Sequence, residues 1–143
     1  MTIDFRAYLG DTLAGVRRIH HALSETVERS VGAVEFRFES GRVLFMDSGP
    51  DGESIRMSAE AWVDPFEGAM TPENVEFVKE SGKLTAFDTS HQEPFVSLIG
   101  TKVVDLAPMM ALSNKVIGCV VNIDGVFVAV YTSFDDCYVA RLP

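Results

Sequence analysis

The sequence contains few cysteines and no long apolar run, and each absence excludes a class of protein. Its 143 residues include only Cys119 and Cys137, which are too few for a disulfide scaffold. No run of about 18 apolar residues is present, so the sequence predicts no membrane-spanning helix. The first residues, MTIDFRAYLGD, carry acids where a signal peptide needs a basic start and an apolar stretch. We therefore expect a cytoplasmic protein.

Complete chemical motifs are also missing. The sequence has no phosphate-binding loop, dinucleotide fingerprint or CxxC pair. His20 and His21 are adjacent, and neighbours on a strand point to opposite faces, so they do not easily share a metal ion. His91 follows Ser90 in DTSHQE, but a catalytic triad depends on spatial geometry, and Ser90 with Glu93 fits a helix capping box better. We predict no catalytic residue, no metal and no cofactor, and hence a binding protein in place of an enzyme.

Basic residues are scarce in the middle of the chain. The net charge is −9, and residues 47–93 contain eleven acidic residues against Arg56, Lys79 and Lys83. That stretch therefore carries −8, which leaves −1 for the rest of the chain. Phosphate groups are bound by Lys and Arg, so this distribution disfavours nucleic acid and anionic membranes as partners. It is compatible with a basic protein partner.

Two stretches of the chain share a pattern. SGPDGESIRM (48–57) has the build of TSFDDCYVAR (132–141), with Asp51 matching Asp135 at a spacing of 84 residues. Before a hairpin turn the spacing becomes 85, and the matched pairs there are Phe38 with Ile123, Phe36 with Val121, Val34 with Cys119, Ile19 with Val104, and Leu13 with Leu98. This pattern predicts an internal duplication of residues 13–58 and 98–142, joined by an acidic, helix-containing segment 59–97.

Each copy has the alternation of an antiparallel β unit. AVEFRFE, RVLFMD and SIRMS in the first copy correspond to GCVVNI, VFVAVYT and CYVARL in the second. GVRRIHHAL and GTKVVDLA are the leading strands, although the first could instead be helical. Asp135 and Asp136, next to Cys137, are interpreted as turn residues, because Asp side chains bond nearby backbone N–H groups. We predict one α+β domain over residues 1–143, with two pseudo-repeated units of three to four strands and a few short helices.

The joining segment contains the best helix signals. Thr71 can cap a helix over 71–81, Pro72 suits its first position, and Gly82 can end it. Val75 and Val78 are expected to face the core. HQEPFVSLIG and TIDFRAYLG are expected to form further short helical turns.

The chain resembles the small, acidic, cytoplasmic immunity proteins of bacterial toxin–immunity pairs in its size, charge, α+β pattern and lack of catalytic motifs. This resemblance implies a toxin partner that the protein inhibits by direct binding. We expect the acidic segment to supply the contact residues, which are Glu60, Trp62, Asp64, Glu67, Glu73, Glu76 and Glu80. For Trp62, the one tryptophan, a role as a packing anchor is the alternative.

A second function is also open on the sequence. The protein could bind a small ligand, or be an enzyme, with a site between the two β units. The residues to test in that case are His20, His21, Asp51 and Asp135.

Overall fold

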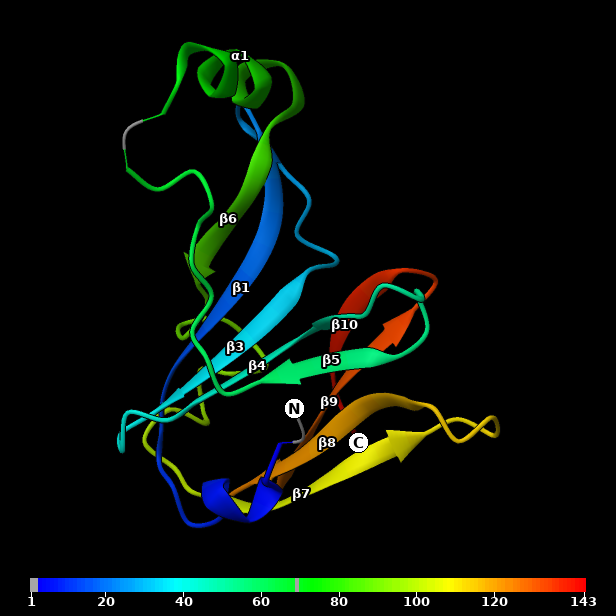
Figure 1. Ribbon diagram of the computed structural model, residues 1–143. Coiled ribbons are helices and arrows are strands. Elements are labelled where there is room, and N and C mark those ends of the chain that lie inside the picture. Colours follow the sequence, from blue (N-terminus) through cyan, green and yellow to red (C-terminus); the bar gives the residue numbers. More distant parts are fainter. Residues whose placement is uncertain (1–2, 69) are drawn as a thin grey trace.

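The computed structural model describes residues 3–68 and 70–143, which form two antiparallel sheets and a projecting helix (Figure 1). The first sheet has six strands in the order β2-β1-β3-β4-β5, with β6 paired to β1. The second has four strands in the order β10-β9-β8-β7. The strands of the first sheet are β1 (Leu13–Leu23), β2 (Thr26–Val27), β3 (Ala33–Phe38), β4 (Val43–Ser48), β5 (Ile55–Ser58) and β6 (Lys83–Asp88). Those of the second are β7 (Val103–Met110), β8 (Val116–Ile123), β9 (Val126–Ser133) and β10 (Asp136–Arg141).

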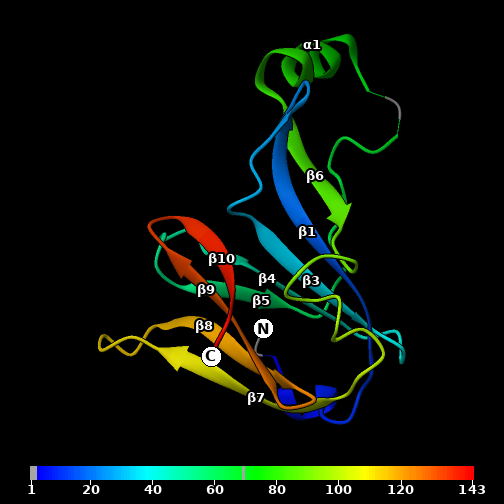
Figure 2. The same ribbon diagram turned by 180° about the vertical axis from the view of Figure 1, so that it is seen from behind.

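The two sheets pack face to face on one apolar core. Alternation along β3 turns Val34, Phe36 and Phe38 inward, as the sequence predicts, and all three are buried. The same cluster contains side chains from β8, β9 and β10, so both sheets contribute to it. Phe36 meets Phe95 edge-on, with 6.0 Å between ring centroids. The core therefore joins the two sheets into one body (Figure 2).

The leading strands β1 and β7 start with the same irregularity. In β1 a bulge separates Leu13, opposite Phe38, from Gly15, opposite Arg37. In β7 a bulge separates Val103, opposite Ile123, from Asp105, opposite Asn122. Leu13, opposite Phe38, thus corresponds to Val103, opposite Ile123, and these two residues are 90 apart. The matches of Leu13 with Leu98 and of Ile19 with Val104, which assume a spacing of 85, are therefore wrong. The spacing of 85 holds for Phe38 and Ile123 in the next strand.

Backbone hydrogen bonds join the segments just before β1 and β7. The N–H of Gly10 donates to Val103 O and that of Gly100 to Leu13 O, both at 2.8 Å. Between these bonds, Thr12 and Lys102 form an isolated antiparallel bridge. The starts of the two sheets are therefore tied to each other through main-chain contacts as well as through the core.

Helix is rarer than expected. The predicted helix at 71–81 is confirmed as α1 (Pro72–Ser81), with the Thr71 side chain accepting from Asn74 N and Gly82 following the last residue. The N-terminal turn is a 3-10 helix, Phe5–Tyr8. Residues 91–100 form turns and no helix, so the capping box of Ser90 with Glu93 is wrong. The Ser90 hydroxyl instead accepts from Val16 N at 3.0 Å.

One part of the molecule projects from this body. The described loop residues 59–68 and 70–71, α1 and β6 extend alongside the far end of β1 and away from the second sheet, and we call this part the arm (Figures 1 and 2). Val75 and Val78 do not face a core, which corrects the sequence prediction, because none of the ten residues of α1 is buried. No helix in the described part of the chain is long and apolar enough to cross a membrane.

Candidate functional site

The predicted contact residues fall on two parts of the arm. Glu73, Glu76 and Glu80 lie on α1 and are exposed. Their spacing of three and four residues brings them to one side of the helix. Glu60 and Glu67 are exposed in the loop that precedes α1. The arm therefore presents acids from both its helix and its loop.

Apolar side chains accompany these acids. Val75 is 49% exposed and Phe77 is 54% exposed, although a core helix normally buries such residues. The Phe77 ring stacks on Phe66 of the loop, with 6.1 Å between ring centroids. Met70 and Val63 of the loop are exposed as well. The helix thus has acidic and apolar groups on its surface but only the loop and the far end of the first sheet to pack against.

One ion pair holds the loop to β6. The Lys83 ammonium pairs with the Asp64 carboxylate, and Asp64 also accepts from Phe66 N at 2.8 Å. The bond from Lys83 lowers the pKa of Asp64. Of the predicted contact residues, Asp64 is therefore already paired within the chain.

Trp62 is fixed by a buried carboxylate on β3. The Glu35 side chain is fully buried and accepts from Trp62 N at 2.8 Å, while Arg17 donates to Glu35 at 2.8 and 2.9 Å and to Trp62 O at 3.1 Å. Burial alone would raise the pKa of Glu35, but hydrogen bonds from Arg17, Trp62 and Arg37 outweigh it and lower the pKa to about 2. The Trp62 ring packs, partly buried, on a small cluster around Ile19. It fits the packing role, and the Glu35 network sets where the loop leaves the body.

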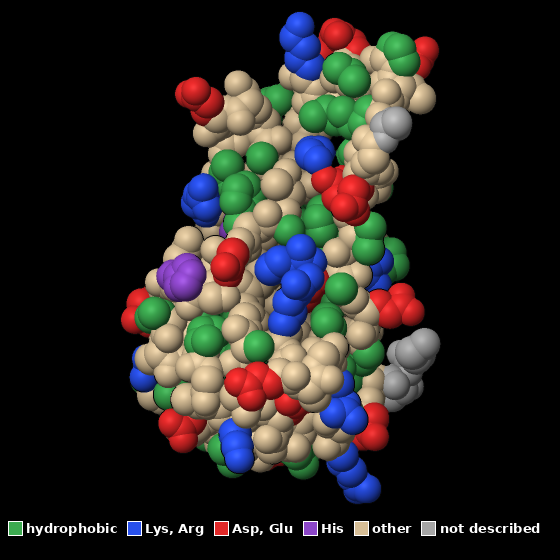
Figure 3. Space-filling model, turned by 90° about the vertical axis from the view of Figure 1, so that its left-hand side faces the viewer, with side chains coloured by type: hydrophobic (Ala, Val, Ile, Leu, Met, Phe, Trp, Pro, Cys, Tyr) green, Lys and Arg blue, Asp and Glu red, His purple; other side chains and the backbone are tan. Residues whose placement is uncertain are grey.

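The acids on one side of the molecule are dispersed. On the side of the molecule that Figure 3 shows, Asp and Glu side chains are separated by Lys, Arg and apolar groups. A partner that lay over this side would meet acids next to apolar patches, not one continuous negative field.

His20 and His21 have different surroundings, as expected for neighbours that point to opposite faces of a strand. His20 is buried, with Nδ1 2.8 Å from Val31 O, and burial lowers its pKa. His21 is exposed, with Nε2 2.8 Å from Ser81 O. Within residues 3–68 and 70–143, no group of three or more His, Cys, Asp or Glu side chains could hold a metal ion.

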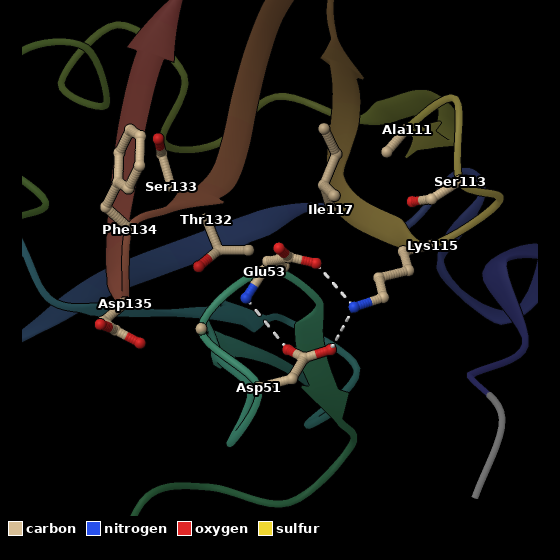
Figure 4. Close-up of a pocket in the computed structure, with 11 residues that line it drawn as sticks. Asp51, Glu53, Ala111, Ser113, Lys115, Ile117, Thr132, Ser133, Phe134 and Asp135 are labelled. Atoms are coloured by element: carbon tan, nitrogen blue, oxygen red, sulfur yellow. Dashed lines mark hydrogen bonds and ion pairs between the residues drawn. The ribbon is translucent and has the colours of Figure 1, made fainter.

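Asp51 and Asp135 come together between the two sheets. The turn of Phe134 and Asp135 has φ of 48° and 72°, which confirms the turn interpretation for Asp135, whereas Asp136 is the first residue of β10. Asp135 N donates to Gly52 O at 3.0 Å. Asp51 and Asp135 both line a cavity of about 500 Å³ (Figure 4). Its other lining residues are Gly52, Glu53, Ala111, Ser113, Lys115, Ile117, Thr132, Ser133 and Phe134. Cys137 is buried nearby on β10, and burial raises its pKa to about 12, so the thiol is not activated.

Lys115 is a charged residue of this cavity that the sequence did not point to. Its ammonium lies 2.6 Å from Glu53 Oε2 and 3.4 Å from Asp51 Oδ2 (Figure 4). The bond to Glu53 raises the pKa of Lys115, and bonds from Ser54 lower that of Asp51. The lysine is more than sixty residues from its partners and in no motif, so only the packing of the sheets reveals the cluster.

Comparison of the chain with protein-family models, curated proteins and solved structures found no match. The function is therefore argued from the arm and the cavity themselves.

Proposed function

We propose that the protein is a cytoplasmic binding protein that engages a basic protein partner through the arm, and that it acts as an immunity-type inhibitor of a bacterial toxin. The observation that carries this proposal is α1. A ten-residue helix that buries none of its residues gains little from its own chain, yet it keeps Val75 and Phe77 at its surface among acids. Apolar groups rimmed by charge are typical of protein-binding surfaces.

The acids and the apolar groups would have different tasks. Glu73, Glu76 and Glu80 would steer a basic partner and raise the rate of association. Val75 and Phe77 would be desolvated in the complex and slow its dissociation, as buried aromatic anchors do. Such a surface inhibits by occlusion, so the inhibitor itself needs no catalytic group.

Two reversals of the same charge test this division of tasks. Candidate toxins encoded beside this protein would be purified, and association measured by surface plasmon resonance at several salt concentrations. Glu76→Lys on α1 should slow association, while Glu39→Lys in the turn between β3 and β4 should leave it unchanged. Equal effects of the two reversals, or on-rates that do not respond to salt, would contradict the role of the arm.

The internal duplication is part of the same proposal. The shared bulges of β1 and β7, and the paired hydrogen bonds of Gly10 and Gly100, support two pseudo-equivalent halves made of β1, β3, β4 and β5 on one side and β7 to β10 on the other. Residues 59–88 have no counterpart in the second half. A segment without a counterpart in the other unit is not part of the architecture that the two units share. It can therefore carry a specific function, which again favours the arm.

A small-ligand site between the two β units remains the second candidate. It is favoured by the cavity that contains both Asp51 and Asp135. His20 and His21 do not line this cavity, so they drop out of that candidate.

A further inference from the structure

The face of the second sheet that points away from the first sheet carries two apolar rows of side chains. Strand pairing brings together Ala107, Val120, Ala129 and Ala140 in one row, and Met109, Gly118, Tyr131 and Tyr138 in the other. We call the residues of these two rows the outer face. The rings of Tyr131 and Tyr138 stack, with 5.5 Å between their centroids. Neither row contains a charged residue, although a sheet face turned to water is normally polar.

The outer face is not part of the core that the two sheets share. On β8, Cys119 and Val121 are buried in that core, so Val120 between them is turned to the opposite side. A β carbon at Gly118 would lie 3.0 Å from Met109 Sδ, which places the methionine on this opposite side as well. Val120, the two tyrosines and Met109 belong to neither hydrophobic cluster of the described residues. The second sheet therefore has a covered apolar face and an uncovered one.

The same place on the first sheet is charged and covered. Counted from the bulge in β1, the positions that match Ala107, Val120 and Ala129 are held by Arg17, Glu35 and Phe45. There the loop before α1 lies over the sheet, with Trp62 bonded to Glu35 and Arg17 and packed on the cluster that contains Phe45. On the second sheet Val120 and both tyrosines stay partly exposed. A surface of the kind that the first sheet covers with its own loop is thus open on the second.

Charge favours a second copy of the chain as the partner of the outer face. The −8 of residues 47–93 lies outside the second sheet. Residues 98–143 contain three basic and four acidic residues, and hence carry only −1 of the total of −9. Two copies that met through the arm or β5 would bring their acids together, which costs affinity. At the outer face two copies meet with the least repulsion, whereas a basic protein gains no attraction from rows without charge.

The area is sufficient for a weak dimer. With strands about 4.8 Å apart and a rise of about 3.4 Å per residue, four strands over about six residues span about 20 by 20 Å. Two such faces together cover about 800 Å² as flat areas and more as accessible surface, and specific interfaces begin near about 1,200 Å². Face-to-face packing of two sheets is also a common way to bury apolar sheet faces. The dimension therefore fits a reversible dimer and not an obligate one.

We propose that the protein forms a reversible two-fold dimer in which the outer faces of two copies pack on each other. Val120, Tyr131 and Tyr138 make the central contacts, and the acidic segments of both copies are turned away from the interface. The helix α1 lies at the other end of the molecule from the second sheet, so the arm is not used (Figure 1). The dimer does not depend on the function proposed for the arm.

Sedimentation velocity of the full chain over a wide range of concentrations tests the dimer. The mass should rise with concentration from that of one chain toward that of two, with a dissociation constant on the order of 10 to 100 µM. Higher salt should leave the dimer unchanged or strengthen it, because it screens the repulsion between two chains of charge −9. A chain that stays monomeric at several times this concentration would overturn the proposal. So would a dimer that salt dissociates, since opposite charges would then hold it.

NMR spectra of the same dilution series locate the contact. Concentration-dependent shifts are expected in residues 105–109, 118–122, 127–131 and 138–142, while those of α1 stay constant. Shifts centred on α1 or on the turn 49–54 would mean that two copies meet through another surface, and would overturn the proposal. A monomeric chain whose outer face shifts only when a purified toxin is added would assign the face to that toxin and not to a second copy.

Two matched substitutions separate the outer face from a general effect of charge. Val120→Lys places an ammonium group in the centre of the face and should weaken the dimer at least tenfold, because the charge is desolvated at the interface. Val63 is 67% exposed in the loop before α1, and Val63→Lys should change the dissociation constant less than twofold. Equal effects of the two variants would refute the outer face as the contact.

A milder variant keeps the test valid if Val120→Lys does not fold. Val120→Thr retains the β-branched shape and replaces a methyl group by a hydroxyl, so it should fold and weaken the dimer about fivefold. Thermal melts of each variant confirm that the fold is kept. A folded Val120→Thr protein that dimerises as tightly as the wild type would show that Val120 is outside the interface, and would overturn the proposal.

Discussion

The body and the arm are built by different means. In the body, inward-facing side chains such as Phe36 and Leu44 are fully buried, and both sheets share them. In the arm, the helix α1 buries none of its residues, and the loop is held by Lys83 with Asp64 and by the bonds of Trp62 to Glu35 and Arg17. The body is thus stabilised mainly by apolar burial, and the arm by a few polar links at its base. The exposed side chains of α1 are therefore little needed for the stability of the fold, which leaves them accessible to a partner.

The largest expected effect lies at the centre of the body. Phe36→Ala should lower the free energy of unfolding by about 3–5 kcal/mol, because it leaves a cavity beside Phe95 that the packed sheets cannot close. Urea denaturation followed by circular dichroism measures this loss. A loss below about 1 kcal/mol would mean that the two sheets do not depend on this shared contact.

The link between body and arm should give the next largest effect. Glu35→Gln should cost about 2 kcal/mol at neutral pH, because Arg17 and Trp62 N lose a charged acceptor. The folded-state pKa of about 2 lies below the ordinary 4.5, so this stabilisation is complete above pH 4.5 and is lost as the pH falls toward 2.

Urea midpoints measured from pH 7 to pH 2.5 test that link. The wild type and Glu35→Gln should differ at neutral pH and converge on acidification. A difference that does not change with pH would place the effect of the substitution in packing and not in the ionised carboxylate.

Sequence patterns predicted the local features well. Thr71, Pro72 and Gly82 act within a few residues of each other, so the helix boundaries could be predicted. The turn before Asp136 was equally readable, because its geometry is decided by neighbouring residues.

The features that depend on distant contacts were missed. The alternation of residues in β3 places Glu35 on the polar face of the strand, but it does not reveal that the loop containing Trp62 covers this side chain. Helical spacing of Val75 and Val78 does not tell whether a core lies beside them. In the leading strands of the two units, apolar residues recur at spacings of both 85 and 90 residues, so the sequence alone did not distinguish the two alignments. The bulges and the strand pairing in the structure select the spacing of 90. The cavity, with Lys115 far from Asp51 in sequence, exists only after the sheets pack.

On the arm the same kind of substitution should have a small effect. Phe77→Ala should change the free energy of unfolding by less than about 1 kcal/mol, because the ring is half exposed and gives up only its stacking on Phe66. The urea denaturation used for Phe36→Ala provides the comparison. If Phe77→Ala cost as much as Phe36→Ala, the arm would be part of the folding core and the contrast between the two regions would fail.

The smallest expected effect is at the turn beside the cavity. Asp135 has φ of 72°, a conformation that Asn adopts more readily than most residues. Asp135→Asn should therefore change the free energy of unfolding by less than about 0.5 kcal/mol, since backbone geometry and the bond from Asp135 N to Gly52 O are kept. Asp135→Ala, which has no polar side chain to support this conformation, should cost about 1 kcal/mol. Thermal melts of both variants measure the difference. A destabilisation by Asp135→Asn as large as that by Asp135→Ala would contradict this expectation. It would show that the carboxylate itself stabilises the contact between the two sheets.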